Sequence, residues 1–144
     1  IKKIDMKLDK KKICLFKLKK YTSISGNLIS INALKQNQFP FDIKRVFFVK
    51  AKKNAVRGNH AHRKCSQLLI CLSGKLEIEI INSNLVSKKY NLDEQDNNAI
   101  FLPIMHWVKI KFKNNHTLLG VLCNYKYDKK KEYINNFQKF KNLK

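Results

Sequence analysis

The sequence has little proline or glycine and no long apolar run. Two prolines and four glycines in 144 residues exclude collagen-like and low-complexity chains. No stretch approaches the roughly 20 consecutive apolar residues that a membrane-spanning helix needs. The N-terminus opens IKKIDMKLDKKK rather than with an apolar secretory core. We therefore expect a folded chain that acts in the cytoplasm without a membrane partner.

Arginine is also scarce, although the chain is strongly basic. Lysine and arginine total 31 against 10 acidic residues, a formal net charge of +21, yet only Arg45, Arg57 and Arg63 are arginines. A basic excess of this size raises the possibility of nucleic-acid binding. The lysines are spread along the chain, however, and arginine makes the better bidentate contacts to phosphates and bases. We expect a solvated basic surface and no nucleic-acid partner.

Disulfide pairing is not indicated by the few cysteines. Cys14, Cys65, Cys71 and Cys123 lie far apart, with no CxxC pair. Three of them, Cys14, Cys71 and Cys123, stand in apolar runs, where a reduced cysteine packs as a small hydrophobic residue. They are predicted to be reduced core or near-core residues, which agrees with a reducing compartment.

Short runs rich in Ile, Val, Leu and Phe dominate the chain and are typical of β-strands. Several alternate apolar and polar residues, as in Lys75 to Ile81, so one face of a sheet is apolar and the other wet. Turn residues separate the runs, and the connections are too short for crossover helices, so the pairing should be mostly antiparallel. Nine such strands are predicted: 13–19, 28–34, 43–50, 67–73, 75–81, 85–92, 99–102, 107–113 and 117–124.

A helix is predicted only at the C-terminus. Tyr133, Ile134, Phe137 and Phe140 recur at three- and four-residue spacing, and Asp128 is a candidate cap for the first turn. The length suits one domain, so residues 1–144 are expected to form a single all-β domain, a sandwich or barrel, with a short C-terminal helix. Residues 1–12 and 141–144 are the expected sites of fraying.

Residues that could carry chemistry concentrate between residues 57 and 74, in the string RGNHAHRKCSQLLICLSG. In a strand His60 and His62 project to the same face, so two imidazoles can converge on one small volume. The alternative is a pair of surface or hydrogen-bonded histidines without a function. The glycine before the pair and Gln67 after it favour a site.

This string resembles the first cupin motif, in which a glycine and HxH are followed by a glutamate and a further glycine. Pro103 to His106 resemble a degraded second motif. The resemblance implies a small jelly-roll barrel whose mouth holds His60, His62, Gln67 and His106. Metal-dependent cupins bind their ion with three histidines and a glutamate, but Gln67 is a neutral and weaker ligand. We expect no metal and no other cofactor.

The flanking residues sharpen the resemblance. The whole chain resembles the nucleotide-linked 4-keto-6-deoxysugar 3,4-ketoisomerases, cupins that precede a 3-aminotransferase. The matching pieces are 25–28, 40–48, 57–62, Gln67, 127–128, 132–134 and Phe140. Two departures concern Phe47 and Phe48, where members often carry tyrosines, and Ser25, where some carry arginine. The second departure leaves the configuration of the product at carbon 4 open.

The resemblance implies that the chain moves the keto group of a dTDP-4-keto-6-deoxy-D-hexose from carbon 4 to carbon 3. The product would serve the biosynthesis of a 3-amino-3,6-dideoxyhexose for surface glycans. Such a reaction needs no electron acceptor, because a base removes the hydrogen on carbon 3, an enediol forms and carbon 4 is reprotonated. Imidazole titrates near neutrality and can take or give a proton.

Roles follow for the site residues. His62 is assigned as the carbon base and His60 as its partner at the oxygen or in the reprotonation, a division that the sequence leaves open. Arg57 and Arg45 would stabilise the enediolate or hold the diphosphate. The remaining expected substrate contacts are Phe48, Gln67, His106 and Trp107, with plain core packing as the alternative for Phe48 and Trp107.

Three other functions stay open at this stage. They are a metal-dependent cupin oxygenase, a carbon-5 epimerase of similar sugars, and a non-catalytic module that binds a sugar or nucleic acid. A homodimer with exchanged N-terminal strands is expected, because an unpaired lysine-rich edge strand is a liability and cupins of this kind often exchange that strand.

Overall fold

The computed structural model describes residues 2–3, 9–31 and 42–143, and within them strands predominate. The single helix in this part of the chain is α1 (Phe137–Asn142). The strands are β1 (Lys2–Lys3), β2 (Cys14–Lys17), β3 (Lys19–Ser23), β4 (Gly26–Ser30), β5 (Arg45–Ala51), β6 (Val56–His62), β7 (Gln67–Ser73), β8 (Lys75–Ile81), β9 (Ser87–Asp93), β10 (Asn98–Leu102), β11 (Trp107–Phe112), β12 (Thr117–Cys123) and β13 (Tyr133–Ile134).

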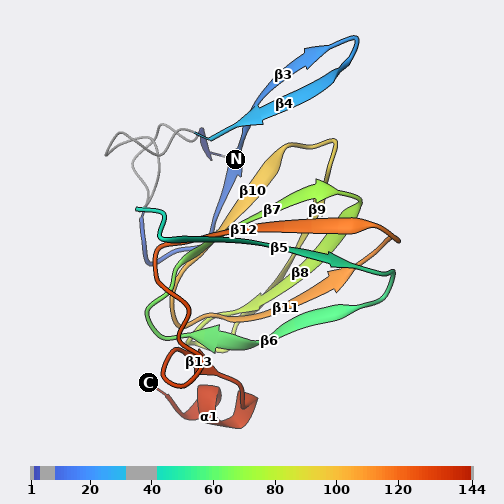
Figure 1. Ribbon diagram of the computed structural model, residues 1–144. Coiled ribbons are helices and arrows are strands. Elements are labelled where there is room, and N and C mark those ends of the chain that lie inside the picture. The colour runs from blue at the N-terminus through green and yellow to red at the C-terminus, as the bar shows by residue number, and fades with distance from the viewer. Residues whose placement is uncertain (1, 4–8, 32–41, 144) are drawn as a thin grey trace.

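Two facing sheets form the body of the molecule (Figure 1). One has the order β1-β2-β10-β7-β12-β5 and the other the order β13-β6-β11-β8-β9. All pairs are antiparallel except β1 with β2, as the short connections predict. The consecutive strands β5 and β6 lie in different sheets, so the two sheets are not closed into a continuous barrel. The predicted all-β, jelly-roll-like fold is confirmed, with one open side.

Alternation places the main core between the sheets. On β8 the residues Leu76, Ile78 and Ile80 are buried while their neighbours are more exposed. They pack against inward-facing residues of the other strands. Because successive side chains of a strand point to opposite faces, the apolar residues of an alternating run identify the face that is turned toward the core.

The six-stranded sheet is apolar on its outer face as well. Phe16, Leu68, Ile70, Ala99 and Phe101 are buried there in a second cluster, on the side opposite to Leu69 and Ile100, which belong to the main core. An antiparallel sheet with water on one side would show polar residues at these positions. The outer face of this sheet is therefore a second packing surface.

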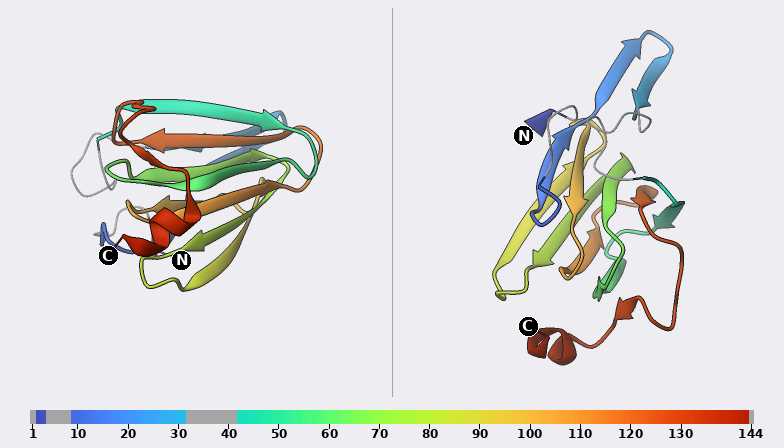
Figure 2. Two further views of the ribbon diagram at one scale, coloured as in Figure 1. Left: turned by 90° about the horizontal axis from the view of Figure 1, so that it is seen from below. Right: turned by 90° about the vertical axis from the view of Figure 1, so that its left-hand side faces the viewer.

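Strands β3 and β4 form a separate hairpin that projects away from the two sheets (Figures 1 and 2). Most of its side chains are exposed, including the tip residue Ile24. The strand predicted over 13–19 is thus divided between β2 and the start of β3. Residues 32–34 of the strand predicted over 28–34, and residues 1 and 4–8 of the segment 1–12 that is expected to fray, lie outside the described residues.

The C-terminal helix is shorter than predicted. It is capped by Asn136, whose side chain accepts a hydrogen bond from the Lys139 backbone N–H at 2.9 Å. Tyr133 and Ile134 form β13 instead of a helical turn, because they pair with β6. Asp128 caps only an isolated turn before β13. Among the described residues, no helix is long and apolar enough to cross a membrane.

The cysteines agree with the prediction where the structure tests it. Cys65, Cys71 and Cys123 are buried and reduced. All three belong to the main core between the sheets. They therefore act as packing residues rather than as disulfide staples.

Candidate active site

A cavity of about 430 Å³ opens on the unclosed side between β5 and β6. Its floor is apolar and comes from strands of both sheets, whereas its polar groups come mainly from β5, β6, β7 and β13. The polar lining residues are Arg45, Arg57, His60, His62, Gln67 and Tyr133. A mostly apolar cavity with a few convergent polar groups is the usual form of a small-molecule site.

A bulge in β6 brings Arg57 and His60 to the same face. Opposite β6, Val108 pairs with His60 but the next residue of β11 pairs with Gly58, so Asn59 is the extra residue. Gly58 has a φ of +85°, and a Cβ there would lie 2.7 Å from the Val108 carbonyl oxygen. Only glycine meets both conditions without strain. The glycine of the HxH motif therefore aims two functional side chains, three residues apart, into one cavity.

The two histidines lie side by side with Tyr133. The ring centroids of His60 and His62 are 4.8 Å apart, and Tyr133 lies 5.0 Å from the first and 4.7 Å from the second. Burial lowers the pKa of His60. Burial, with His60 and Arg45 beside it, lowers the pKa of His62 to about 3. Both imidazoles are thus neutral near pH 7 and free to accept a proton.

Arg45 is held between two aromatic rings. Its guanidinium carbon lies 4.5 Å from the ring centroid of Phe47 and 4.7 Å from that of Tyr127. Such stacking fixes the plane of the guanidinium and leaves its edges, which carry the N–H donors, for hydrogen bonds. One of these hydrogen bonds goes to the Tyr133 side chain. Arg45 also contributes to the lowered pKa of His62. A fixed positive charge therefore stands near the proposed base.

Glu132 is a buried acid behind His62. Its Oε1 accepts hydrogen bonds from the backbone N–H groups of Lys64 at 2.8 Å and Cys65 at 2.7 Å. The same oxygen lies 3.7 Å from His62 Nδ1, and both side chains are almost fully buried. The loop that follows the HxH motif is thus tied to the segment that precedes β13.

Three predicted substrate contacts lie outside the cavity. Trp107 is paired with Ala61, the residue between the two histidines, so it projects from the opposite face and packs 5.1 Å from Phe137 and 5.8 Å from Phe140 between ring centroids. Phe48 is 63% exposed on the outer face of β5, and its neighbour Phe47 lines the cavity instead.

His106 is also absent from the lining residues. Its Nδ1 is 2.8 Å from the Ile104 carbonyl oxygen, in the bend before β11. The degraded second motif thus supplies no side chain to this cavity. His106, like Trp107 and Phe48, is therefore not included in the proposed site.

The donor set does not fit the metal of the metal-dependent cupins. Gln67 donates through Nε2 to Cys123 Sγ at 3.7 Å, so its amide is engaged with the wall and offers no charge. Within the described ranges, no group of three or more His, Cys, Asp or Glu side chains is arranged to hold a metal ion. We derive no catalytic step through a metal.

Sequence reasoning did not assign Phe47, Tyr133 or Glu132 to the site. Phe47 could have been assigned to the site from the sequence, because it shares the face of Arg45 in an alternating strand. Tyr133 and Glu132 arrive through the pairing of β13 with β6. That pairing joins segments about 70 residues apart, and no local periodicity indicates it.

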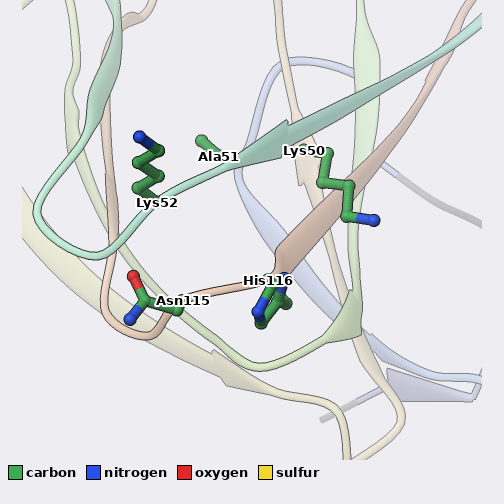
Figure 3. A pocket seen from close by; sticks show the side chains of 5 residues that line it. All are labelled: Lys50, Ala51, Lys52, Asn115 and His116. Carbon is green, nitrogen blue, oxygen red and sulfur yellow. The ribbon is translucent and has the colours of Figure 1, made fainter.

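A second hollow of about 410 Å³ lies at the end of β5, beside the loop that precedes β12 (Figure 3). It is lined by Lys50, Ala51, Lys52, Asn115 and His116. Four of these five residues are exposed, and no paired imidazoles occur among them. The chemistry therefore concentrates in the cavity between β5 and β6.

Comparisons with known proteins point to one family. The family model described as FdtA, WxcM-like, C-terminal, matches residues 11–144. The chain is 30% identical over 124 residues to a TDP-4-oxo-6-deoxy-alpha-D-glucose-3,4-oxoisomerase of Aneurinibacillus thermoaerophilus, covering 85% of this chain and 86% of the relative.

Solved structures agree with this match. QdtA, a sugar 3,4-ketoisomerase of Thermoanaerobacterium thermosaccharolyticum solved with TDP, superposes with a TM-score of 0.80 at 28% identity, covering 90% of this chain and 91% of QdtA. WlaRB, a TDP-quinovose 3,4-ketoisomerase of Campylobacter jejuni, superposes with a TM-score of 0.81 at 27% identity, covering 92% of this chain and 99% of WlaRB.

Proposed function

The chain belongs to the FdtA family, and on this basis we propose that it is an isomerase that moves the keto group of a dTDP-4-keto-6-deoxy-D-hexose from carbon 4 to carbon 3. The observation that supports this most is the pair of histidines with lowered pKa, His62 buried and His60 partly buried, that face one cavity together with two arginines. The product serves the biosynthesis of a 3-amino-3,6-dideoxyhexose for surface glycans.

The reaction is a proton relocation along two carbons. His62 takes the proton from carbon 3 as that C–H bond breaks, and the electron pair moves through the new carbon–carbon double bond to the oxygen on carbon 4. The enediolate oxygen on carbon 4 then receives the proton that the carbon-3 hydroxyl gives up, which leaves the charge on the carbon-3 oxygen. As the carbonyl forms at carbon 3, carbon 4 takes a proton from a protonated histidine, with His60 as the partner for oxygen or carbon. Proton transfer by a positioned side chain contributes about 10²–10⁴-fold to such a step.

Arg45 and Arg57 are proposed to stabilise the negative charges of the substrate. Arg45, fixed between Phe47 and Tyr127 and close enough to lower the pKa of His62, is placed to stabilise the enediolate oxygen. Arg57 lies at the exposed rim and suits the diphosphate. Gln67 is a further substrate contact on the wall.

The test is one incubation of the purified protein with dTDP-4-keto-6-deoxyglucose in D₂O, followed by NMR. We expect the 3-keto isomer with deuterium at carbon 4, and chelator treatment should leave the rate unchanged. Deuterium at carbon 5 without a keto shift would identify an epimerase, and activity restored only by iron or manganese would identify a metal-dependent enzyme. Binding without any turnover would leave a non-catalytic module.

A homodimer with exchanged N-terminal strands is part of the proposal. The β3–β4 hairpin exposes Tyr21, Ile24 and Leu28 and stands off the sheets (Figure 2). On β5, at the other edge of the six-stranded sheet, Val46 and Phe48 are exposed as well. Exposed apolar patches are typical of protein–protein interfaces.

Sedimentation tests the dimer. The parent should sediment as a dimer at micromolar concentration, and Phe48→Glu should shift it toward the monomer. Val86, equally apolar and half-exposed but next to β9 in the other sheet, provides the control substitution Val86→Glu. A monomeric parent would contradict the proposal.

We place the enzyme in the cytoplasm, where nucleotide-linked sugars are made. The buried reduced cysteines agree with a reducing compartment. We propose no nucleic-acid partner. Fractionation of cells that express the tagged protein tests this location.

A further inference from the structure

Glu132 is an unusual acid for this chain. It is one of only ten acidic residues, and its side chain is 4% exposed. Burying a carboxylate is costly unless it is hydrogen-bonded or paired. Its Oε1 accepts from two backbone N–H groups, those of Lys64 and Cys65, and its backbone carbonyl accepts from Arg63 N at 3.0 Å. The carboxylate is thus fixed in place, next to the loop that continues from His62.

His62 lacks the hydrogen bonds that a buried imidazole normally makes. Within the described part of the chain, neither Nδ1 nor Nε2 has a hydrogen-bond partner. Glu132 Oε1 lies 3.7 Å from Nδ1, slightly beyond hydrogen-bond length. Catalytic hydrogen bonds are often long without substrate and shorten in the reacting complex.

Two neighbouring groups disfavour the protonated form of His62. His60 on the same strand and Arg45 on β5 lower its pKa, in addition to burial. Tyr133 on β13 lies 4.7 Å away between ring centroids and supplies no negative charge, because burial raises the pKa of its hydroxyl. A base that must become positively charged during the reaction therefore needs one compensating negative charge, and Glu132 is the acid in contact range.

We infer that Glu132 is a positioning residue for His62: it accepts a hydrogen bond from Nδ1–H, which leaves the lone pair on Nε2, and it stabilises the imidazolium that forms when Nε2 takes the proton of carbon 3. This inference rests on the proposed function for the proton that is moved, but the approach of Glu132 to Nδ1 is present without substrate. The proton passes from carbon 3 to Nε2, and Glu132 accepts only the hydrogen bond from Nδ1–H.

The first test needs no substrate and so separates this inference from the proposed reaction. Histidine is labelled with ¹⁵N, and the His62 signals are identified by their loss in His62→Asn. We expect the parent at pH 7.5 to carry the proton of His62 on Nδ1. A parent in which His62 carries the proton on Nε2 overturns the inference, whatever the protein does to a sugar.

The second test uses Glu132→Gln, which keeps one oxygen for the two backbone N–H groups and removes only the charge. We expect kcat to fall more than tenfold, toward the contribution of a positioned base of about 100-fold, while KM stays within about threefold of the parent and the melting temperature within a few degrees. Glu79→Gln is the matched control, because Glu79 lies on the outer face of β8, and it should leave kcat unchanged. A fall in kcat of less than tenfold in folded Glu132→Gln overturns the inference; if that variant is unfolded, the tautomer of the parent decides.

Discussion

The two faces of β5 and β6 carry side chains with different roles. The inward face carries Arg45, His60 and His62 into the cavity. The outward face carries Phe48, which is exposed, and Ala61, which packs under Trp107 and the C-terminal helix. Neighbouring residues of one strand therefore have different roles, one in the cavity and the other in packing or on the surface. The comparison teaches that assignment to the site depends on register, because a shift of one residue exchanges the two faces.

The largest expected effect comes from the inward face. His62→Asn should lower kcat by about 10²–10⁴-fold, since a positioned general base contributes that much. Turnover of the nucleotide-sugar measures this, and circular dichroism should show an unchanged fold. His60→Asn should also be severely impaired. Full activity in His62→Asn would contradict the assignment of the base.

The matched change on the outward face should affect stability instead. Trp107→Ala is expected to destabilise the protein by about 3–5 kcal/mol, the usual cost of removing a buried aromatic side chain. Urea unfolding measures this loss. At a temperature where the variant is folded, its KM should equal that of the parent. A raised KM with unchanged stability would return Trp107 to the substrate site.

Replacing an arginine that lines the cavity should impair turnover of the dTDP-sugar more than replacing a lysine outside the cavity. Arg45→Ala should lower kcat/KM by roughly ten- to a hundredfold, about 1.5–3 kcal/mol, because it removes hydrogen bonds to the charged enediolate oxygen. Steady-state turnover of the dTDP-sugar measures this. Lys50→Ala is the control, because Lys50 projects from the outward face of the same strand and should change kcat/KM little. Equal effects of the two substitutions would break the comparison.

Burial of His62 predicts a dependence of stability on pH. Its pKa is lowered to about 3 in the folded protein and is near 6.5 when the chain unfolds, so the unfolded chain binds the proton between these values. The contribution of neutral, buried His62 to the free energy of unfolding is fully present above pH 6.5 and is lost as the pH falls below that value. Between pH 7 and pH 5 the parent should lose roughly 2 kcal/mol more stability than His62→Asn. Urea unfolding at both pH values measures the difference, and parallel losses would contradict the neutral, buried His62.

The smallest effect is expected from the surface lysines. Lys129, Lys130 and Lys131 are exposed, and their charges are screened over a Debye length of about 8 Å at physiological salt. Replacing all three with alanine should leave kcat and KM nearly unchanged. The same protein, titrated with a short oligonucleotide at two salt concentrations, should bind it weakly. Tight binding that depends on these lysines would favour a nucleic-acid function.

Much of the fold was predictable because alternation is a local property. The strands from β7 to β12 agree closely with the predicted runs, since each must bury one face. The helix predicted after a cap at Asp128 was wrong in the part that precedes Asn136. Tyr133 and Ile134 pair with β6, and a partner far along the chain outweighs a weak helical pattern. Phe48 was assigned to the site against its own alternation with Arg45.

By itself, the sequence determined that His60 and His62 share a face, that Gly58 permits the bulge beside them, and that the chain forms an all-β fold. These features follow from side-chain period and backbone freedom, which act within a few residues. Only the tertiary structure decided that Tyr133 and Glu132 surround His62 and that Trp107 faces away from the cavity. The reason is physical: the register between strands distant in sequence is selected by the packing of the whole core, which no local pattern contains.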